Sequence, residues 1–201
     1  GAAELWAQVL SAVELVKQRN PDAISCCDPV IGDVDRGVYV RPGIPEFMRD
    51  RVIPAAQIVT PNHFELDFLT GRVTTTVDEA LDAADALRAT GPDVVLVTST
   101  VLADSDPDQM QMLVDTVRGS GRVATPKLEP TFTGSGDLTA ALFLAHYLSG
   151  GDPAAALGRT ADAVYSVLDA TARAGSAELL LVSAQDQLVS PDHHFEVERL
   201  R

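Results

Sequence analysis

Thr131-Phe-Thr-Gly-Ser-Gly-Asp137 is the stretch that decides the fold, and it runs directly into the apolar segment Leu138-Thr-Ala-Ala-Leu-Phe-Leu-Ala-His-Tyr-Leu148. Thr139 and His146 are the only strongly polar members of that segment. Because they are seven residues apart, they share one face of a helix. The rest of the helical circumference is apolar, which predicts a helix that is buried on most sides.

The glycines before this helix suit the binding of an anion. If the helix begins near Gly136, the amides of Gly134, Ser135, Gly136 and Asp137 lie at its positive end without intrahelical acceptors. A carboxylate beside an anion site suits phosphoryl transfer to an alcohol, because the amides hold phosphate charge while Asp137 takes the proton of the attacking hydroxyl. The alternative is that Asp137 is only an N-cap and the glycines only a turn, since Gly-x-Gly-Asp is short and common.

Composition limits the class of protein. With 201 residues and 46% hydrophobic content, the chain can bury a substantial core, and we expect one domain over residues 1–201. The formal net charge of −14 argues against a nucleic-acid or anionic-membrane partner. Because no apolar run reaches about eighteen residues and no signal-peptide pattern is present, we expect a cytoplasmic protein. The adjacent Cys26 and Cys27 would point to opposite sides of a strand, so we expect structural thiols and no disulfide.

Periodicity predicts an α/β protein. Short apolar runs alternate with segments of helical spacing, and the pattern of three strand-then-helix units indicates a layered, mainly parallel sheet. The predicted strands are 23–27, 57–60 and 93–98, a hairpin of 109–117 with 122–125, and a last strand at 179–182. The predicted helices are 3–19, 45–51, 62–69, 76–90, the helix from residue 136, and 152–174.

Several polar residues follow predicted strands, at the edge where ligands gather in open α/β sheets. Asp28 ends the first strand and is either a site residue or a turn former before Pro29. Glu65 lies in the first helical turn after the second strand, where it either completes a capping box or reaches toward a metal. Thr60 ends the second predicted strand and Thr98 ends the third. Each is available either to bind a ligand or to cap a turn.

Two further segments have open interpretations. Residues 30–45 read as a loop, which is either a mobile flap or an ordinary connection with a short hairpin. His193 and His194 stand in a polar tail, where a metal site would need further ligands.

Four motifs resemble those of pyridoxal kinases, in order and spacing. They are Cys27-Asp-Pro-Val-Ile-Gly-Asp33, Val59-Thr-Pro-Asn-His-Phe-Glu-Leu66 with Leu69-Thr-Gly71, Val95-Leu-Val-Thr-Ser99, and Phe132-Thr-Gly-Ser-Gly-Asp137. The resemblance is strongest to the bacterial branch of this ribokinase-like family, with the hydroxymethylpyrimidine kinases as near relatives. It implies a three-layer α/β fold with a central, mostly parallel sheet. It also implies that about eighty residues are missing before this chain, including the first strands and most contacts to the pyridoxal ring, so that apolar sheet edges are exposed.

The resemblance also implies roles for individual residues. Asp137 would bind the substrate and act as the catalytic base for the 5'-hydroxyl of pyridoxal, with Gly134, Ser135 and Gly136 as the anion hole. Asp28 and Glu65 would organise Mg²⁺ through water beside the ATP phosphates. The expected nucleotide contacts are Thr60 and Thr98, with the adenosine bordered by Thr125, Pro126, Lys127 and Leu128. Residues 30–43 would form the flap over ATP.

The implied function is transfer of the γ-phosphate of ATP to pyridoxal, which forms pyridoxal 5'-phosphate. Mg²⁺, a monovalent cation and a homodimeric assembly belong to the same expectation. Two alternatives remain beside it: a non-catalytic remnant that still binds nucleotide, and a hydroxymethylpyrimidine kinase.

Overall fold

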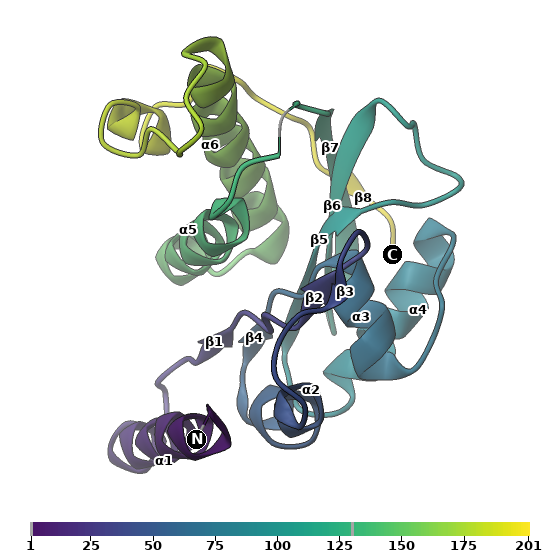
Figure 1. The fold of residues 1–201 in the computed structure, drawn as a ribbon, viewed down its shortest axis with the longest axis vertical. Helices are drawn as coiled ribbons and strands as arrows, with labels where there is room; N and C mark the ends of the chain where they lie inside the picture. Colours follow the sequence, from purple (N-terminus) through teal and green to yellow (C-terminus); the bar gives the residue numbers. More distant parts are fainter. Residues whose placement is uncertain (1, 130) are drawn as a thin grey trace.

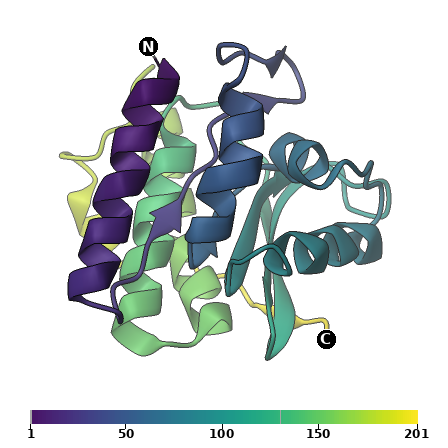
Figure 2. The ribbon, with the colours of Figure 1, turned by 90° about the horizontal axis from the view of Figure 1, so that it is seen from below.

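The computed structural model describes residues 2–129 and 131–201, which build a mixed six-stranded sheet between two layers of helices (Figures 1 and 2). The strands, in their order across the sheet, are β1 (Cys26–Cys27), β4 (Ile58–Val59), β5 (Val94–Thr100), β6 (Gln109–Thr116), β7 (Gly119–Pro126) and β8 (Glu198–Arg199). The helices are α1 (Ala2–Arg19), α2 (Ile44–Phe47), α3 (His63–Thr70), α4 (Val77–Arg88), α5 (Ser135–Gly150) and α6 (Pro153–Arg173). Short pieces complete the set: the hairpin strands β2 (Gly32–Asp33) and β3 (Gly37–Val38), a π-helical turn at Met48–Val52, and 3-10 turns at Ile53–Ala55 and Gln185–Leu188.

The expected parallel arrangement is found in one half of the sheet. Strands β1, β4 and β5 pair in parallel, whereas β5 with β6, β6 with β7, and β7 with β8 pair antiparallel. The described sheet is therefore mixed rather than mostly parallel. The predicted hairpin of β6 and β7 is confirmed: Thr116 pairs with Gly119, which leaves a two-residue turn at the tip.

The two faces of the sheet carry separate apolar clusters. Along β4 and β5, Ile58 and Leu96 pack with α5 and α6, whereas Val59, Val95 and Val97 pack with α3 and α4. This alternation follows from the period of two in a β-strand. Both faces of the central strands are thus covered, and the expected three-layer arrangement is confirmed (Figure 1).

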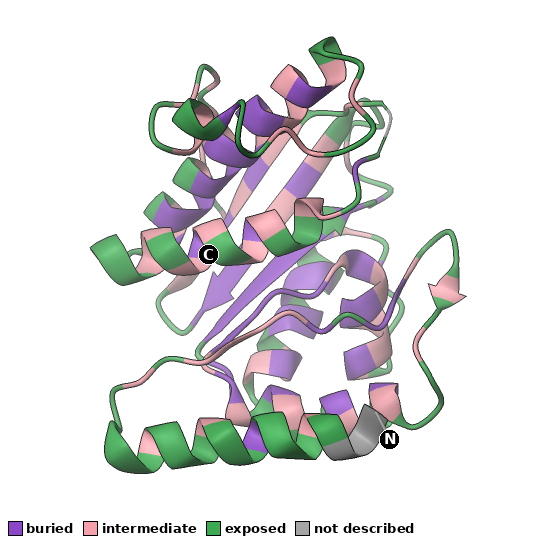
Figure 3. Ribbon diagram, turned by 60° about the vertical axis from the view of Figure 1, so that its left-hand side comes forward, coloured by how far each residue is buried: buried purple, intermediate pink, exposed green. Residues whose placement is uncertain are grey.

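The prediction that the helix after Asp137 is buried on most sides is wrong for the described chain. Only Thr139 and Phe143 of α5 are buried, and Leu148 is 58% exposed. Helix α1 likewise exposes Leu5 (62%) and Val16 (54%), and Figure 3 shows its outer surface as exposed beside a buried sheet. The physical reason is that, among the described residues, β1 next to these helices pairs with β4 alone, so no described strand covers this side of the sheet.

The predicted strand at 179–182 is also wrong. This segment forms turns against α6, where the amide of Leu180 donates to Thr171 Oγ1 and Val182 is 81% exposed. An apolar run of four residues does not distinguish a strand from a packed turn. The last strand is instead β8, which pairs with Gly121 and Arg122 of β7.

Residues 193–201 bind elements from all three layers. His193 and His194 contact Asp169 and Asp162 of α6 at 2.9 and 3.0 Å, β8 pairs with β7, and the Arg201 guanidinium contacts Asp82 of α4 at 2.8 Å. Within the described residues, no helix has the length and apolar character required to span a bilayer.

Phe143 is the side chain through which α5 is anchored, since it is fully buried and lies 6.2 Å, centroid to centroid, from Tyr147. We expect Phe143→Ala to lower the free energy of unfolding by about 3–5 kcal/mol, because it removes buried apolar area and leaves a cavity. Urea denaturation monitored by circular dichroism measures the change. Leu148→Ala, on the exposed side of the same helix, is the control and should change stability by less than about 1 kcal/mol. Equal losses for both variants would contradict this account of α5.

Candidate functional site

The ends of β1 and β4 bring Asp28 and Thr60 into contact. The Thr60 hydroxyl donates a hydrogen bond to Asp28 Oδ1 at 3.1 Å, and the Thr60 amide donates to the Cys27 carbonyl at 3.0 Å. Burial raises the pKa of Asp28, the Thr60 hydrogen bond opposes that rise, and the negative charge of Asp137 adds to it. Asp28 therefore lies within electrostatic reach of Asp137, although the two residues are 109 positions apart in the sequence.

Helix α3 begins four residues after the end of β4 and places Glu65 in this region. Asn62 is the N-cap: its Oδ1 accepts from the Glu65 amide, and Glu65 Oε2 accepts from the Asn62 amide, both at 2.9 Å. The predicted capping box is thus confirmed. Burial raises the pKa of Glu65 to about 7, hydrogen bonds from three backbone amides oppose that rise, and the charge of Asp28 adds to it. The buried Glu65 and the half-buried Asp28 therefore form an acidic pair that a cation would stabilise.

The turn before α5 places Asp137 at the third helical position. Gly134 is the N-cap, with a left-handed φ of 89°, and the helix begins at Ser135, one residue earlier than expected. The interpretation of Asp137 as N-cap is therefore wrong, and the turn depends on Gly134 because a side chain there would be strained. A side chain at Gly136 would meet nothing within 4 Å, so this part of the helix end is open. Asp137 is exposed.

The amides of this turn are only partly free. The Ser135 amide makes a long hydrogen bond of 3.4 Å to the Phe132 carbonyl, and the Leu138 amide bonds to the Gly134 carbonyl at 3.0 Å. An anion at the helix end would compete with the first of these bonds and leave the second intact.

Residues 30–43 contain an ordered hairpin beside α3 (Figures 1 and 2). Strands β2 and β3 pair antiparallel, and the Tyr39 amide donates to the Ile31 carbonyl at 3.1 Å. At the tip, Asp33 binds Arg36, whose guanidinium lies 4.5 Å from the centre of the Tyr39 ring. The short hairpin expected in one interpretation of this loop is present, and the flap over ATP stays a prediction.

Thr98 lies at the same sheet edge as Thr60. Its amide donates to the Pro61 carbonyl at 2.8 Å, and Thr98 forms a parallel bridge with Asn62. The next residue, Ser99, adopts a φ of 52°, which turns the chain sharply at this point. Thr98 is thus next to the cap of α3.

The segment 125–128 lies farther along the sheet, at the end of β7. Thr125 Oγ1 donates to the Met110 carbonyl at 3.4 Å, and the Lys127 amide donates to the Asp108 carbonyl at 2.8 Å. Pro126 and Lys127 are exposed and Leu128 is half-buried. In the described part of the chain, no hydrogen bond joins this segment to the acidic pair or to Asp137.

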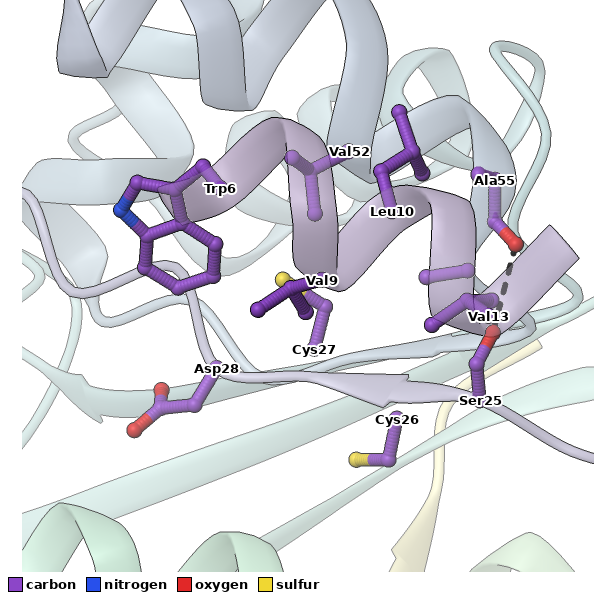
Figure 4. A pocket seen from close by; sticks show the side chains of 11 residues that line it. Trp6, Val9, Leu10, Val13, Ser25, Cys26, Cys27, Asp28, Val52 and Ala55 are labelled. Carbon is purple, nitrogen blue, oxygen red and sulfur yellow. Dashed lines mark hydrogen bonds between the residues drawn. The ribbon is translucent and has the colours of Figure 1, made fainter. Parts of the chain in front are cut away.

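A cavity of about 180 Å³ lies between α1 and β1, with Asp28 in its lining (Figure 4). Its walls are mainly apolar and include Trp6, Val9 and Val13, which does not suit a phosphate. Cys27 points toward α1 and Cys26 toward the opposite side of the strand, as predicted. Burial is the main cause that raises the pKa of Cys26 to about 11 and that of Cys27 to about 12. Both are free thiols, and their raised pKa values are those of inert, structural cysteines.

Metal binding by the histidine tail is not supported by its contacts, because His193 and His194 each pair with one carboxylate of α6. Across residues 2–129 and 131–201, the structure has no group of three or more His, Cys, Asp or Glu side chains that could hold a metal ion. The sequence did not reveal the contacts of Glu65 and Asn62 with the hairpin backbone. The capping-box pattern was their only available signal.

Comparisons with known proteins identify the family to which this chain belongs. A family model described as phosphomethylpyrimidine kinase matches residues 6–181. The chain is 47% identical over 201 residues to pyridoxal kinase PdxY of Rubrobacter xylanophilus, covering 100% of this chain and 69% of that protein. It is 44% identical to pyridoxal kinase PdxY of Deinococcus radiodurans, again covering 100% and 69%.

Solved structures give the same result for the fold. Pyridoxal kinase from Entamoeba histolytica matches with a TM-score of 0.86 and 26% identity, covering 98% of this chain and 69% of that one. Pyridoxal kinase from Leishmania donovani in complex with ADP and pyridoxamine matches with a TM-score of 0.85 and 27% identity, covering 99% and 71%. The fold is thus that of the ribokinase-like superfamily. Within it, the chain belongs to the pyridoxal kinase family and spans about 69% of the length of such relatives.

The contact between Asp28 and Thr60 gives a test of the site geometry. We expect Thr60→Val to raise the pKa of Asp28 further, because the hydroxyl that stabilises the carboxylate is lost. Carbon-13 NMR titration of the Asp28 carboxyl measures this pKa. Thr98→Val changes a threonine at the same edge and serves as the control. An unchanged pKa in Thr60→Val would show that the hydrogen bond is not formed in solution.

Proposed function

We propose that this chain carries the nucleotide-binding and catalytic part of a kinase that transfers the γ-phosphate of ATP to the 5'-hydroxyl of pyridoxal. The observation that carries the proposal is the placement of Asp137 in the first turn of α5, after a glycine turn and within electrostatic reach of Asp28. Membership of the pyridoxal kinase family suggests the reaction, and the arrangement of Asp137 and Asp28 suggests which residues take part in it. Vitamin B6 salvage is the corresponding physiological role.

Asp137 acts as the base that takes the proton of the substrate hydroxyl. It is exposed, so an alcohol can reach its carboxylate, and it stands beside the positive end of a 16-residue helix. Gly134, Ser135 and Gly136 form the anion hole. Their backbone amides donate hydrogen bonds that stabilise the negative charge of the transferred phosphoryl group. The long bond from Ser135 to Phe132 is the one that gives way on binding.

The acidic pair fits Mg²⁺, which prefers oxygen ligands and retains several waters. Glu65 already accepts three backbone hydrogen bonds, so it would hold the ion through water, whereas Asp28 receives the Thr60 bond at Oδ1 and would face the ion with its other oxygen. When bound, Mg²⁺ neutralises phosphate charge. Burial raises the pKa of both carboxyls, and the charge of Asp28 adds to the rise at Glu65. This supports the role, because a nearby cation would favour the charged form of each carboxyl.

Thr60 and Thr98 contact the nucleotide at the same edge, and Thr125, Pro126, Lys127 and Leu128 border the adenosine. The solved Leishmania donovani relative in complex with ADP, 28% identical to this chain, supports nucleotide binding. The exposed side chain of Lys127 is available to a phosphate or ribose. We also propose a homodimer and a cytoplasmic location.

A B6 vitamer is the best-supported substrate, because Leishmania donovani relatives were solved with pyridoxamine and with pyridoxine. The second candidate is a hydroxymethylpyrimidine kinase, since the matching family model is described as phosphomethylpyrimidine kinase. Both reactions use the same base and anion hole. Phosphorylation rates with the two alcohols distinguish them.

This chain spans about 69% of its relatives' length, and we propose that most contacts to the pyridoxal ring come from the remaining part of such a protein. We propose that the additional residues precede it and complete the sheet beside β1. The competing proposal is a remnant that binds nucleotide without catalysis.

The first prediction from this proposal concerns the length of the chain. We expect the 201-residue chain to form no pyridoxal 5'-phosphate with Mg-ATP, and a version extended by the additional residues of the Rubrobacter xylanophilus relative to form it. Product formation is followed by the absorbance of the 5'-phosphate aldehyde. Equal activity of the two versions would mean that the ring contacts come from residues present here.

The second prediction concerns Asp137. In the extended version, Asp137→Asn should lower kcat by about 10²–10⁴-fold, because the proton acceptor is lost, while nucleotide affinity stays within about twofold. Calorimetry with ADP measures the affinity. Asp78→Asn, in the first turn of α4, is the matched control and should retain activity. An active Asp137→Asn enzyme would exclude the proposed mechanism.

A further inference from the structure

The two carboxylate oxygens of Glu65 bind in different directions. Oε1 accepts from the amides of Ile31 and Gly32 at 2.8 and 3.4 Å, at the base of the β2–β3 hairpin. Oε2 accepts from the amide of Asn62 at 2.9 Å, at the start of its own helix. One side chain thus joins two segments that are 34 residues apart in the sequence.

Asn62 makes a second connection of the same kind. Its Oδ1 caps α3 by accepting from the Glu65 amide, while its Nδ2 donates to the Gly32 carbonyl at 2.8 Å. Gly32 is therefore held through its N–H by Glu65 and through its C=O by Asn62. The side chains at the start of α3 thus satisfy both backbone hydrogen-bonding groups of Gly32, as a neighbouring β-strand would do.

Capping alone does not require these contacts, as α4 demonstrates. Helix α4 has the same capping box, formed by Thr76 and Glu79. Among the described residues, Glu79 Oε2 accepts hydrogen bonds from Thr75 and Thr76 alone, within four positions along the chain, and Glu79 is exposed. Glu65, by contrast, is only 3% exposed and bonds to a distant segment. We therefore attribute the burial of Glu65 to its hydrogen bonds with the hairpin backbone and not to capping.

Packing at Gly32 confirms how closely the hairpin base approaches α3. A Cβ at Gly32 would lie 2.4 Å from the Gly37 carbonyl oxygen and 2.6 Å from Phe64 Cε1. Only glycine fits between the second hairpin strand and the helix. The hairpin tip differs, because the contacts of Asp33 and Arg36 are confined to the hairpin itself.

We propose that Asn62 and Glu65 are positioning residues that fasten the base of the β2–β3 hairpin to α3, leaving only its tip free to adapt to a ligand. We call these two residues the hairpin staple. The functional part of this inference rests on the proposed kinase activity: the staple would hold the hairpin beside the phosphate site. The structural part does not depend on that activity.

The chemistry of the staple requires a carboxylate at position 65. A glutamine has one acceptor oxygen, so it could accept from the hairpin amides or from Asn62, and its NH₂ group would face a backbone N–H on the other side. At position 62, serine is as good an N-cap as asparagine but has no amide group to donate to Gly32. Glu65→Gln and Asn62→Ser thus weaken the staple in two independent ways.

The test measures the hairpin directly in the 201-residue chain. We expect amide hydrogen exchange in residues 31–39 to become about tenfold faster in Glu65→Gln and in Asn62→Ser, and trypsin to cleave faster after Arg36. Glu79→Gln is the matched control, since it alters the capping box of α4 and should leave the hairpin unchanged. Unchanged exchange in both staple variants, or an equal increase in Glu79→Gln, would overturn the proposal.

A second measurement separates the staple from metal binding in the extended version. Asn62→Ser should raise KM for ATP more than it lowers kcat, and extra Mg²⁺ should not restore it. Asp28→Asn should instead respond to added Mg²⁺ and leave hairpin exchange unchanged. If Asp28→Asn loosens the hairpin as much as Asn62→Ser, the staple assignment fails. If the extended version lacks kinase activity, the proposed function fails, while the exchange experiment still decides the staple.

Discussion

The placement of β4 between β1 and β5 is the constraint on which the rest of the structure depends. Its two residues, Ile58 and Val59, are both fully buried and belong to opposite apolar clusters. Because the three strands run parallel, their carboxyl ends meet at one edge. Thr60 then reaches Asp28, and the cap of α3 follows two residues later. The position of β4 between β1 and β5 therefore determines where Asp28, Thr60 and Glu65 lie.

Much of the fold and part of the site could be predicted from local sequence signals. Helical spacing located α1, α3, α4 and α6, and the alternation of apolar runs located the parallel strands. The capping box at Asn62 and Glu65 was also readable, since both of its hydrogen bonds lie within four residues. The motif order was specific enough to identify the family, which relatives at 47% and 44% identity confirm.

What could not be predicted depends on distant partners. Strand β8 contains only two residues, and its partner in β7 is 76 residues away, so it leaves no periodic pattern. The apolar circumference of α5 predicted burial, but burial also needs a neighbouring element, and no described strand pairs with the outer side of β1. The hairpin contacts of Glu65 involve backbone amides, which every residue carries and which sequence cannot distinguish.

The late position of β8 in the sequence affects how the sheet is completed during synthesis. Until β8 is made, β7 is an open edge strand, and helices α5 and α6 must be translated before its partner exists. An unpaired edge on a nascent chain is a site for association with other chains. The contacts of residues 193–201 with α6, β7 and α4 then form together, because they belong to one short segment. Closure of this edge would therefore be a late, cooperative folding step, limited by the time the ribosome needs to deliver that segment.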